Sequence, residues 1–474
     1  MKTLICIPCL LTGGTEIQTL NTVHALVRGG HEVTVACYFE HTPDMVERYR
    51  KAGAEVILFS PEGVRVEGYK SILFLYRHLR RAVKAVRPDV VHVQYMAPGA
   101  TVILLLWLMG VKNIIATAHT AADIYRDLCL IHFLQRHCLR AFTCITERAE
   151  HSFFGSSQLY TPETVLGKRN HFTIYNSLPV QLGGSCNEDE NENCLRDVAL
   201  NLTQNTQNPQ NTHCFARVTP SGVGTQSHTD CTDYTESISC QRDSHANLDA
   251  ITQNGKSLRP CTSGVSTEGS QLTANSQQLT ANRQQPRAKS QEPNTKLTLG
   301  VVSRLEPIKG MDLVVPAFAE VLGAHPEVRL LVVGDGSLRA SMEEQAAQLA
   351  CADHIRFVGR QPQEELAQWY RQMDIVLMPS RSEGFGLTAI EAMASGCVVV
   401  ASDVGGLPEV VRDGICGLLH RTEDVTDMVE KICFLIGDEA LYDRLQAQSL
   451  VEVEKYSFER YAALMNDLYN KLGR

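Results

Sequence analysis

Residues 375–401 read IVLMPSRSEGFGLTAIEAMASGCVVVA, and this stretch decides the fold. A short apolar run at 375–378 leads into a glycine-containing turn, a helical pattern at 388–394 and a second apolar run at 398–401. Short strands without a polar face are typical of a parallel sheet that helices cover on both sides. A strand, a helix and a second strand in this order therefore predict one unit of a parallel α/β sheet.

The same alternation extends through both halves of the chain. In the second half, it predicts further strands at 297–302, 329–333 and 355–358, helices at 311–322, 338–350 and 364–371, and helices from 401 to the end. In the first half, it predicts helices at 15–28 and 69–86 and strands at 3–8, 32–36, 55–59, 90–93 and 114–117, with two more near 144–145 and 173–175.

A chain of 474 residues is too long for one ordinary core, so two domains are expected. We predict an α/β protein with two Rossmann-like, doubly wound domains that face a central cleft. The N-terminal domain spans 1–181 and the C-terminal domain spans 296–474. We also expect the last helix to pack back on the N-terminal domain.

Residues 182–295, between the two predicted domains, differ sharply in composition. Gln, Asn, Ser and Thr dominate, aromatic residues nearly vanish, and QLTAN occurs at both 271–275 and 278–282. Such a segment cannot bury enough apolar surface to offset the entropy of ordering it, so we expect a long disordered insertion. Its six cysteines and several histidines would suit a zinc module, but their spacings match no closed ligand set.

Composition and charge exclude several classes of protein. The formal net charge of -9 argues against a general nucleic-acid binder, which needs an excess of Lys and Arg. The apolar start breaks at Pro8 with no cleavage site after it, and the most apolar run, 101–109, is about half the length that crosses a bilayer. We therefore expect a cytoplasmic protein. Most of the 16 cysteines fall within apolar patterns, where they act as small hydrophobes.

The turn at 379–388 has the features of a diphosphate site. Backbone amides at the helix start, around Phe385, Leu387 and Thr388, have no intrahelical partner and can face an anion. Gly384 and Gly386 let a ligand approach the backbone closely. Glu383 in the loop and Glu391 one turn into the helix could then meet the hydroxyls of a sugar and of a ribose. Alone, two acids eight residues apart would be weak evidence.

Two cations follow the first strand of the C-terminal domain. Arg304 and Lys309 lie in VSRLEPIKG, residues 302–310. Fixed cations can stabilise the negative charge that builds on a departing diphosphate, although taken alone they could equally be ordinary surface cations beside a turn. Because the cations already supply positive charge and no Asp-x-Asp motif occurs in a suitable context, we expect neither a metal ion nor a cofactor.

These two elements resemble the Glu-x7-Glu and Arg-x4-Lys-Gly elements of retaining GT-B glycosyltransferases, the large family 4 or glycosyl transferases group 1. The resemblance covers both predicted domains, and the insertion has no counterpart in it. By the same resemblance, Gly334 corresponds to a turn that lines the donor cleft, and Val358 and Arg360 lie in the segment whose backbone holds the base. Gly13 and Gly14 correspond to a loop that faces the donor phosphate, and His119 to a histidine near the sugar.

The resemblance implies transfer of a hexose-type sugar, with retention of configuration, from a UDP-, GDP- or ADP-linked donor to a saccharide or lipid-linked acceptor. Polysaccharide, lipopolysaccharide or glycolipid synthesis is the expected setting. Catalysis would depend on His119, Glu383, Arg304 and Lys309, and Glu391 would meet the ribose. Asn176 matches a family Asn-Gly turn, but Ser177 stands in place of its glycine. His92, inside a predicted strand, is expected to be an interior histidine with satisfied hydrogen bonds.

The predicted helix at 69–86 is both basic and apolar. It carries Lys70, Arg77, Arg80, Arg81 and Lys84, with Arg87 next to it, beside several leucines, and Arg136, Arg140 and Arg148 follow later. Such a surface can lie on anionic lipid at the inner face of a membrane, or it can be an ordinary solvated helix face.

Three other functions compete with this interpretation of the sequence. The same architecture also serves GT-B epimerases and phosphorylases, although the paired Arg-x4-Lys and Glu-x7-Glu elements argue against them. A non-catalytic nucleotide-sugar-binding scaffold would keep the fold without the turnover. An NAD dehydrogenase would need Gly-x-Gly-x-x-Gly after the first strand, which Gly13 and Gly14 do not supply.

Overall fold

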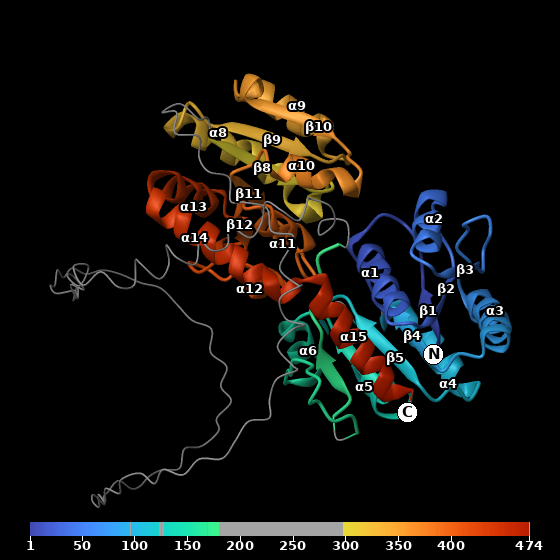
Figure 1. Cartoon of the computed structure of the whole chain (residues 1–474). Coiled ribbons are helices and arrows are strands. Elements are labelled where there is room, and N and C mark those ends of the chain that lie inside the picture. Colours follow the sequence, from blue (N-terminus) through green and yellow to red (C-terminus); the bar gives the residue numbers. More distant parts are fainter. Residues whose placement is uncertain (95, 123–124, 126–127, 168, 180–296, 474) are drawn as a thin grey trace, which may run out of the picture. The chain divides into compact units, whose positions relative to one another are not determined.

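The computed structural model describes residues 1–94, 96–122, 125, 128–167, 169–179 and 297–473 (Figure 1). The predicted insertion at 182–295 lies outside the described residues. The described strands form two parallel sheets, each with its own helices. The prediction of two doubly wound α/β domains is therefore confirmed.

The first sheet has seven strands in the order β3-β2-β1-β4-β5-β6-β7, all paired in parallel. The elements of this half, in chain order, are β1 (Lys2–Ile7), α1 (Gly14–Arg28), β2 (Glu32–Cys37), α2 (Pro43–Lys51), β3 (Glu55–Leu58), α3 (Tyr69–Val86), β4 (Val90–Gln94), α4 (Met96–Leu108), β5 (Ile114–Ala118), α5 (Leu128–His137), β6 (Ala141–Cys144), α6 (Glu147–Phe154) and β7 (His171–Thr173).

The second sheet has six strands in the order β10-β9-β8-β11-β12-β13, again all parallel. The elements of this half, in chain order, are β8 (Thr298–Val302), α8 (Val314–Ala324), β9 (Arg329–Val333), α9 (Arg339–Gln348), β10 (Ile355–Gly359), α10 (Leu366–Tyr370), β11 (Ile375–Met378), α11 (Leu387–Ala394), β12 (Val398–Ser402), α12 (Leu407–Val410), β13 (Gly417–His420), α13 (Val425–Gly437), α14 (Glu439–Glu452) and α15 (Phe458–Leu472).

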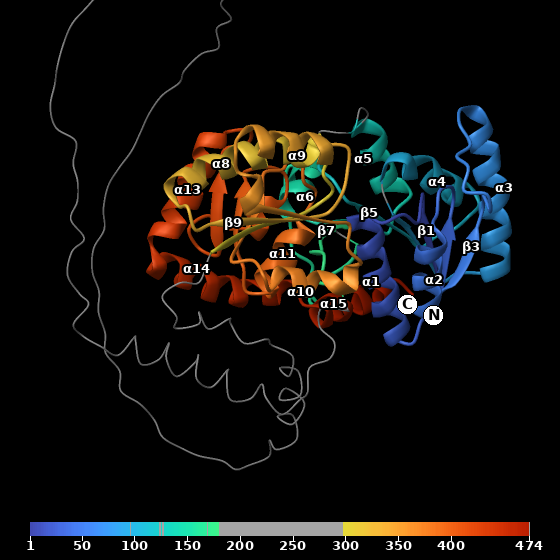
Figure 2. The same cartoon turned by 90° about the horizontal axis from the view of Figure 1, so that it is seen from above.

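Alternate strand residues pack into opposite cores, which is why the strands read as uninterrupted apolar runs. In β9, Leu330 and Val332 pack with α8, α9 and α13, whereas Leu331 and Val333 pack with α10, α11 and α12. The same division occurs in β1, where Ile5 belongs to the core on the α1 side. Helices therefore cover both faces of each sheet (Figures 1 and 2).

Several elements differ from the sequence prediction, helices α2, α4 and α6 and strand β13 among them. Helix α2 was not predicted, although Thr42 caps it and Pro43 starts it, a combination that favours a helix start. The expectation that only helices follow residue 401 is wrong, because the four-residue strand β13 extends the second sheet at its edge. A short strand between loops gives too little periodicity to be recognised.

Helix α15, the last in the chain, packs along α1 of the first half. The Tyr461 hydroxyl lies 2.7 Å from Thr22 Oγ1, and the Asn466 amide donates to the carbonyl of Ala25 at 2.9 Å. Leu468 and Leu472 join the core on that side of the first sheet. The C-terminal helix is thus a structural part of the region around β1 and α1.

Candidate functional site

The loop between β11 and α11 is shaped by its glycines. Gly386, the residue before α11, has φ +101°, and a Cβ there would lie 2.8 Å from the side chain of Leu407. A Cβ on Gly384 would lie only 2.5 Å from the carbonyl oxygen of His119. Only glycine fits both requirements, so the backbone of the loop can approach residue 119 closely just before α11 begins.

The structure brings Lys309 and Glu383 together. Lys309 ends the 3₁₀ turn Pro307–Lys309, and its ammonium lies 2.6 Å from the carboxylate of Glu383, with both side chains about one-fifth exposed. Gly310 follows with φ +65°, and a Cβ there would lie 1.9 Å from the carbonyl oxygen of Pro379. The two loops are therefore in direct contact. The lysine ammonium has two further N–H groups, which could donate hydrogen bonds to an anion.

The carboxyl ends of β8, β9 and β10 lie at one edge of the second sheet. They carry four more of the residues predicted to bind the donor: Arg304, Gly334, Val358 and Arg360. Gly334 has φ +136°, a Cβ on it would lie 1.8 Å from the carbonyl oxygen of Ser303, and its amide donates to Gly359 at 2.9 Å. Arg304 and Arg360 are exposed after β8 and β10, and Val358 is half-buried. Within the described part of the chain, Arg304 makes no hydrogen bond or ion pair with Lys309 or Glu383.

Two predicted donor ligands are buried. Glu391 is 4% exposed, and its two oxygens accept hydrogen bonds from Gln363 at 2.8 Å and from the Tyr370 hydroxyl at 2.9 Å. Burial raises the pKa of Glu391 to about 7, although these two hydrogen bonds lower it. Phe385 is 2% exposed and packs against Tyr456, so its side chain belongs to the core.

The Gly13–Gly14 loop precedes α1 and lies near the start of α11. Gly13 is the N-cap of α1, and a Cβ on Gly14 would lie 3.3 Å from Cδ1 of Leu387. The described residues of both sheets belong to one compact unit. The close contacts at Gly14 and Gly384 therefore join the carboxyl ends of the first sheet to the loop that carries Glu383.

His119 follows β5 and is held by an uncharged side chain. Its Nε2 lies 2.8 Å from Oε1 of Gln94, the last residue of β4, so Nε2 carries the proton and donates. Burial lowers the pKa of His119 to about 3, which keeps the imidazole neutral at neutral pH. His119 is 5% exposed.

His92 is an interior histidine with satisfied hydrogen bonds, as the sequence indicates. The Tyr469 hydroxyl lies 2.7 Å from Nδ1 of His92, and Nε2 lies 2.6 Å from the Thr117 hydroxyl, which in turn lies 2.6 Å from that of Thr143. These groups adjoin a small pocket at the strand ends, which is lined by Gln18, Thr22, Gln94, Thr117, His119, Thr143, Ile145, Ile174, Asn176, Tyr461 and Met465. All its lining side chains are uncharged at neutral pH.

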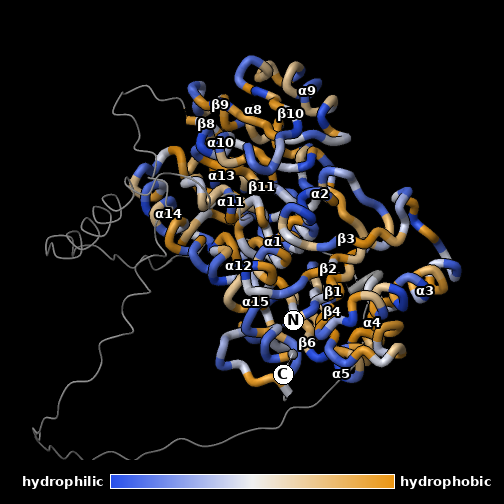
Figure 3. The backbone as a smooth tube through the Cα atoms, turned by 45° about the vertical axis from the view of Figure 1, so that its right-hand side comes forward, coloured by the Kyte–Doolittle hydropathy of each residue, from blue (hydrophilic) through white to orange (hydrophobic). Residues whose placement is uncertain are grey.

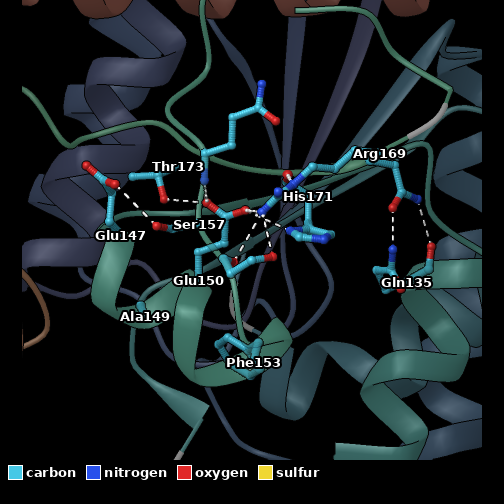
Figure 4. A network of polar contacts seen from close by, with 12 residues as sticks. Gln135, Glu147, Ala149, Glu150, Phe153, Ser157, Arg169, His171 and Thr173 are labelled. Atoms are coloured by element: carbon cyan, nitrogen blue, oxygen red, sulfur yellow. Dashed lines mark hydrogen bonds and ion pairs between the residues drawn. The ribbon is translucent and has the colours of Figure 1, made fainter. Parts of the chain in front are cut away.

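A polar network that the sequence does not reveal holds the end of the first sheet (Figure 4). Glu150 of α6 is fully buried and accepts hydrogen bonds from His171 at 2.7 Å, Thr173 at 2.7 Å and Arg169 at 2.8 Å. Burial raises the pKa of Glu150, but the hydrogen bonds outweigh it and the net shift is downward. The network fixes β7 against α6 and has no accessible carboxylate, so its role is structural.

The N-terminus of α6 accepts a carboxylate from the second half of the chain. The amides of Glu147 and Arg148 donate to the two oxygens of Glu409 in α12, at 2.8 and 2.5 Å. Burial raises the pKa of Glu409. This anion therefore already occupies the positive end of α6.

Neither a metal cluster nor a membrane-spanning helix occurs in the described ranges. No three or more His, Cys, Asp or Glu residues gather there in an arrangement that could hold a metal ion. None of the helices described is both long and apolar enough to cross a bilayer. Seven described cysteines, Cys6 among them, are buried as free thiols.

Comparison with known proteins gives two family matches. Residues 282–450 match the family described as Glycosyl transferases group 1, and residues 12–156 match Glycosyltransferase Family 4. The chain is 38% identical over 176 residues to the D-inositol 3-phosphate glycosyltransferase of Nocardia farcinica, and 40% identical over 176 residues to that of Actinosynnema mirum. These matches cover 36% and 35% of the chain and 39% and 42% of the relatives, so the chain spans about two fifths of their length.

Solved structures share the fold over nearly the whole chain. Anabaena Alr3699/HepE in complex with UDP superposes with a TM-score of 0.63 at 14% identity, covering 99% of this chain and 100% of that one. Sucrose-phosphate synthase from Thermosynechococcus elongatus gives a TM-score of 0.61 at 16% identity, covering 100% and 99%. At these identities the likeness concerns the fold alone.

Proposed function

The chain belongs to the glycosyl transferases group 1 family with the GT-B fold, and from that premise we propose that it transfers a sugar from a nucleotide-sugar to an acceptor hydroxyl. The observation that carries the proposal is the Lys309–Glu383 pair at 2.6 Å, beside the glycine loop that touches His119. A cation, a carboxylate and the start of a helix at one sheet edge suit a substrate that has both a diphosphate and hydroxyl groups.

In the proposed reaction, the acceptor hydroxyl attacks from the side that the diphosphate leaves, so the configuration is retained. Lys309, Arg304 and the first amides of α11 stabilise charge on the leaving nucleoside diphosphate. Glu383 accepts hydrogen bonds from the donor sugar, and neutral His119 binds a hydroxyl of the sugar or acceptor. No step requires a metal ion or a cofactor.

The donor is proposed as a UDP-, GDP- or ADP-linked hexose. Support comes from solved structures of similar fold, in which Alr3699/HepE is named in complex with UDP and with UDP-glucose. The predicted contact between Glu391 and the ribose is less favourable than the sequence suggests, because the buried carboxyl of Glu391 already accepts two hydrogen bonds. A ribose could reach it only if Gln363 or Tyr370 gave way.

The acceptor is proposed as a saccharide or a lipid-linked molecule. The curated relatives are named for D-inositol 3-phosphate, an acceptor with a phosphate. The small pocket beside His119 has room for about one water molecule and no cation in its lining, so it suits a single neutral hydroxyl group rather than a phosphate. Polysaccharide, lipopolysaccharide or glycolipid synthesis would supply such acceptors.

We also propose that one face of the first half contacts anionic lipid. Helix α3 buries Leu75, Leu79 and Ala82 but exposes Tyr69, Ile72, Leu73 and Tyr76 beside its lysines and arginines. Neighbouring α4 and α5 expose Trp107, Leu108, Leu130 and Phe133. Residues 69–146 hold ten Lys or Arg but three acidic residues, although the chain as a whole is acidic. Figure 3 shows the hydrophobic residues along α4 and the mixture of hydrophobic and hydrophilic residues along α3.

Vesicle binding tests this face. The protein should sediment with vesicles that contain one-third phosphatidylserine and much less with phosphatidylcholine alone, and salt should weaken the binding. Arg80→Glu with Arg81→Glu should reduce sedimentation without changing the melting temperature. Equal binding of that variant would show that the face is an ordinary solvated surface.

A donor panel tests the reaction. UDP-, GDP- and ADP-linked hexoses are incubated with saccharide and lipid acceptors, and both the released nucleoside diphosphate and the product are measured. Diphosphate release that depends on an acceptor, with a retained product, supports the proposal. A rearranged sugar-nucleotide without an acceptor would indicate an epimerase, and tight donor binding without turnover would indicate a scaffold.

A further inference from the structure

Arg381 lies two residues before Glu383, and its contacts enclose the turn that carries Lys309. Its amide donates to the carbonyl of Ile308 at 3.0 Å, and its Nη1 donates to the carbonyl of Pro307 at 2.5 Å. These acceptors belong to the two residues directly before Lys309. The contacts therefore fix the backbone of the lysine from the loop that carries the glutamate.

The same guanidinium also holds the chain just after Lys309. Nη1 and Nη2 of Arg381 donate to the two oxygens of Asp312 at 2.7 and 2.8 Å, in the paired geometry that a planar guanidinium favours. The hydrogen bonds from Arg381 lower the pKa of Asp312, so the pair stays ionised at neutral pH. The Nε donates to Glu423 at 2.7 Å.

These contacts occupy the arginine. Four of its five N–H groups are directed at Pro307, Asp312 and Glu423, so it is poorly suited to bind a diphosphate directly. The neighbouring backbone has equally little freedom, because Gly310 lies against the carbonyl of Pro379. Arginine, glycine and aspartate together set the distance between the two loops.

We propose that Arg381 and Asp312 form a clamp that positions Lys309 against Glu383 for the diphosphate of the donor. The role in positioning rests on the proposed function, whereas the clamp itself is a property of the two loops. Arg381 is a positioning residue, because it acts through the backbone on both sides of Lys309. A lysine at this place would keep the charge but lose the fork of paired donors.

Hydrogen exchange tests the clamp without any need for turnover. Arg381→Ala and Arg381→Lys should each speed amide exchange at 305–313 by about 10-fold or more, because a local opening no longer has to break the clamp. Exchange at 339–348 in α9 should stay at the wild-type level. Arg444→Ala provides a matched control, since this exposed arginine makes one hydrogen bond, to Gly414, away from the loops. Unchanged exchange at 305–313 in both variants would overturn the clamp.

Kinetics then tests the positioning role with a donor that the wild type uses. Arg381→Ala should lower kcat by about 10²-fold, the effect of a misplacement of about 1 Å, with a smaller change in KM. Added guanidinium should restore part of kcat, whereas the same concentration of ammonium should not. Asp312→Ala combined with Arg381→Ala should cost no more than Arg381→Ala alone, because the two residues act as one unit.

The outcomes separate the two proposals. If wild type turns over no donor, the proposed function fails, and exchange together with calorimetric affinity for UDP, GDP and ADP decides the clamp. If wild type is active and Arg381→Ala exchanges faster but keeps kcat within twofold, the positioning role is overturned. Faster exchange, a lower kcat and rescue by guanidinium together support both the clamp and its role.

Discussion

Two regions at the carboxyl ends of the sheets, the loops after β8 and β11 and the ends of β4 and β5, carry opposite kinds of polar chemistry. In the second sheet, the loops hold ion pairs, Lys309 with Glu383 and Arg381 with Asp312. In the first sheet, the ends of β4 and β5 hold uncharged groups, Gln94 and His119, and a Cβ on Gly384 would lie 2.5 Å from the carbonyl oxygen of His119. The two regions meet at the glycine loop that contains Gly384.

The difference follows from how each region is built. The charged groups lie on loops and remain partly exposed, so water still solvates them and pairing is inexpensive. The uncharged groups lie on strands or at their ends, are nearly fully buried, and must be satisfied by neighbours across the sheet. One region can thus stabilise a changing charge, whereas the other is suited to orient a neutral hydroxyl group.

Loss of the lysine in the charged region should have the largest effect. Lys309→Ala leaves Glu383 without its partner and removes the cation from the proposed diphosphate site, so kcat should fall by about 10³-fold. Steady-state release of nucleoside diphosphate measures this loss, and circular dichroism checks the fold. Lys51→Ala, at the exposed end of α2, is the control. Wild-type turnover in Lys309→Ala would remove the reason for assigning the charged region to the donor.

The sequence predicts much of the charged region because its residues lie in two short, continuous segments. Lys309 and Glu383 were predicted because their two segments together resemble elements of a known family, and the strand before each segment is a clear apolar run. Arg381 could not be interpreted, since its partner Asp312 is 69 residues away and no local pattern links them. Glu391 was expected at the ribose because its spacing places it near the helix start, but spacing does not reveal burial.

The uncharged region was predicted less completely, for a topological reason. His119 could be placed after a strand, but Gln94 becomes its partner only because β4 and β5 pair in parallel, with Gln94 opposite Thr117. Strand order cannot be read from apolar runs alone. His92 was recognised as an interior residue, yet its partner Tyr469 comes from a helix nearly 400 residues later.

Unlike the other acidic groups near the donor site, Glu391 is almost fully buried. Its effect on the pH dependence of unfolding free energy should be the next largest. Its pKa is raised from 4.5 to about 7 in the fold, so the native state holds a proton that the unfolded state releases between these pH values. Its contribution to stability is therefore fully present below pH 4.5 and is lost as the pH rises through 7. Glu391→Gln keeps the shape and removes this dependence.

Relative to Glu391→Gln, wild type should lose about 3 kcal/mol of unfolding free energy between pH 4.5 and pH 8. Urea unfolding of both proteins at the two pH values measures the difference. A difference that does not change with pH would show that the carboxyl is ionised or solvated in the native protein. Glu439→Gln, at the start of α14, is the matched surface control.

A charge placed in the uncharged region should have a moderate effect that depends on pH. Gln94→Glu puts a carboxylate beside Nε2 of His119 and raises the pKa of that imidazole, so kcat/KM should fall by about 10-fold at pH 6.5 and less at pH 8.5. Gln94→Met removes the hydrogen bond without adding charge, so its loss should not vary with pH. Identical pH profiles for the two variants would mean that the neutral state of His119 has no part in the reaction.

The smallest effect should separate two tyrosines of α15 that support the uncharged region. Tyr461→Phe removes a hydroxyl from Thr22, but that threonine keeps the carbonyl of Gln18 at 3.1 Å, so the unfolding free energy should fall by about 0.5–1.5 kcal/mol. Tyr469→Phe deprives buried Nδ1 of His92 of its hydrogen-bond partner, which should cost about 1–3 kcal/mol. Urea unfolding at pH 7.5 compares the two. A larger loss of unfolding free energy in Tyr461→Phe than in Tyr469→Phe would contradict this explanation. It would show that the hydrogen bonds of His92 are not the main stabilising contacts at these strand ends.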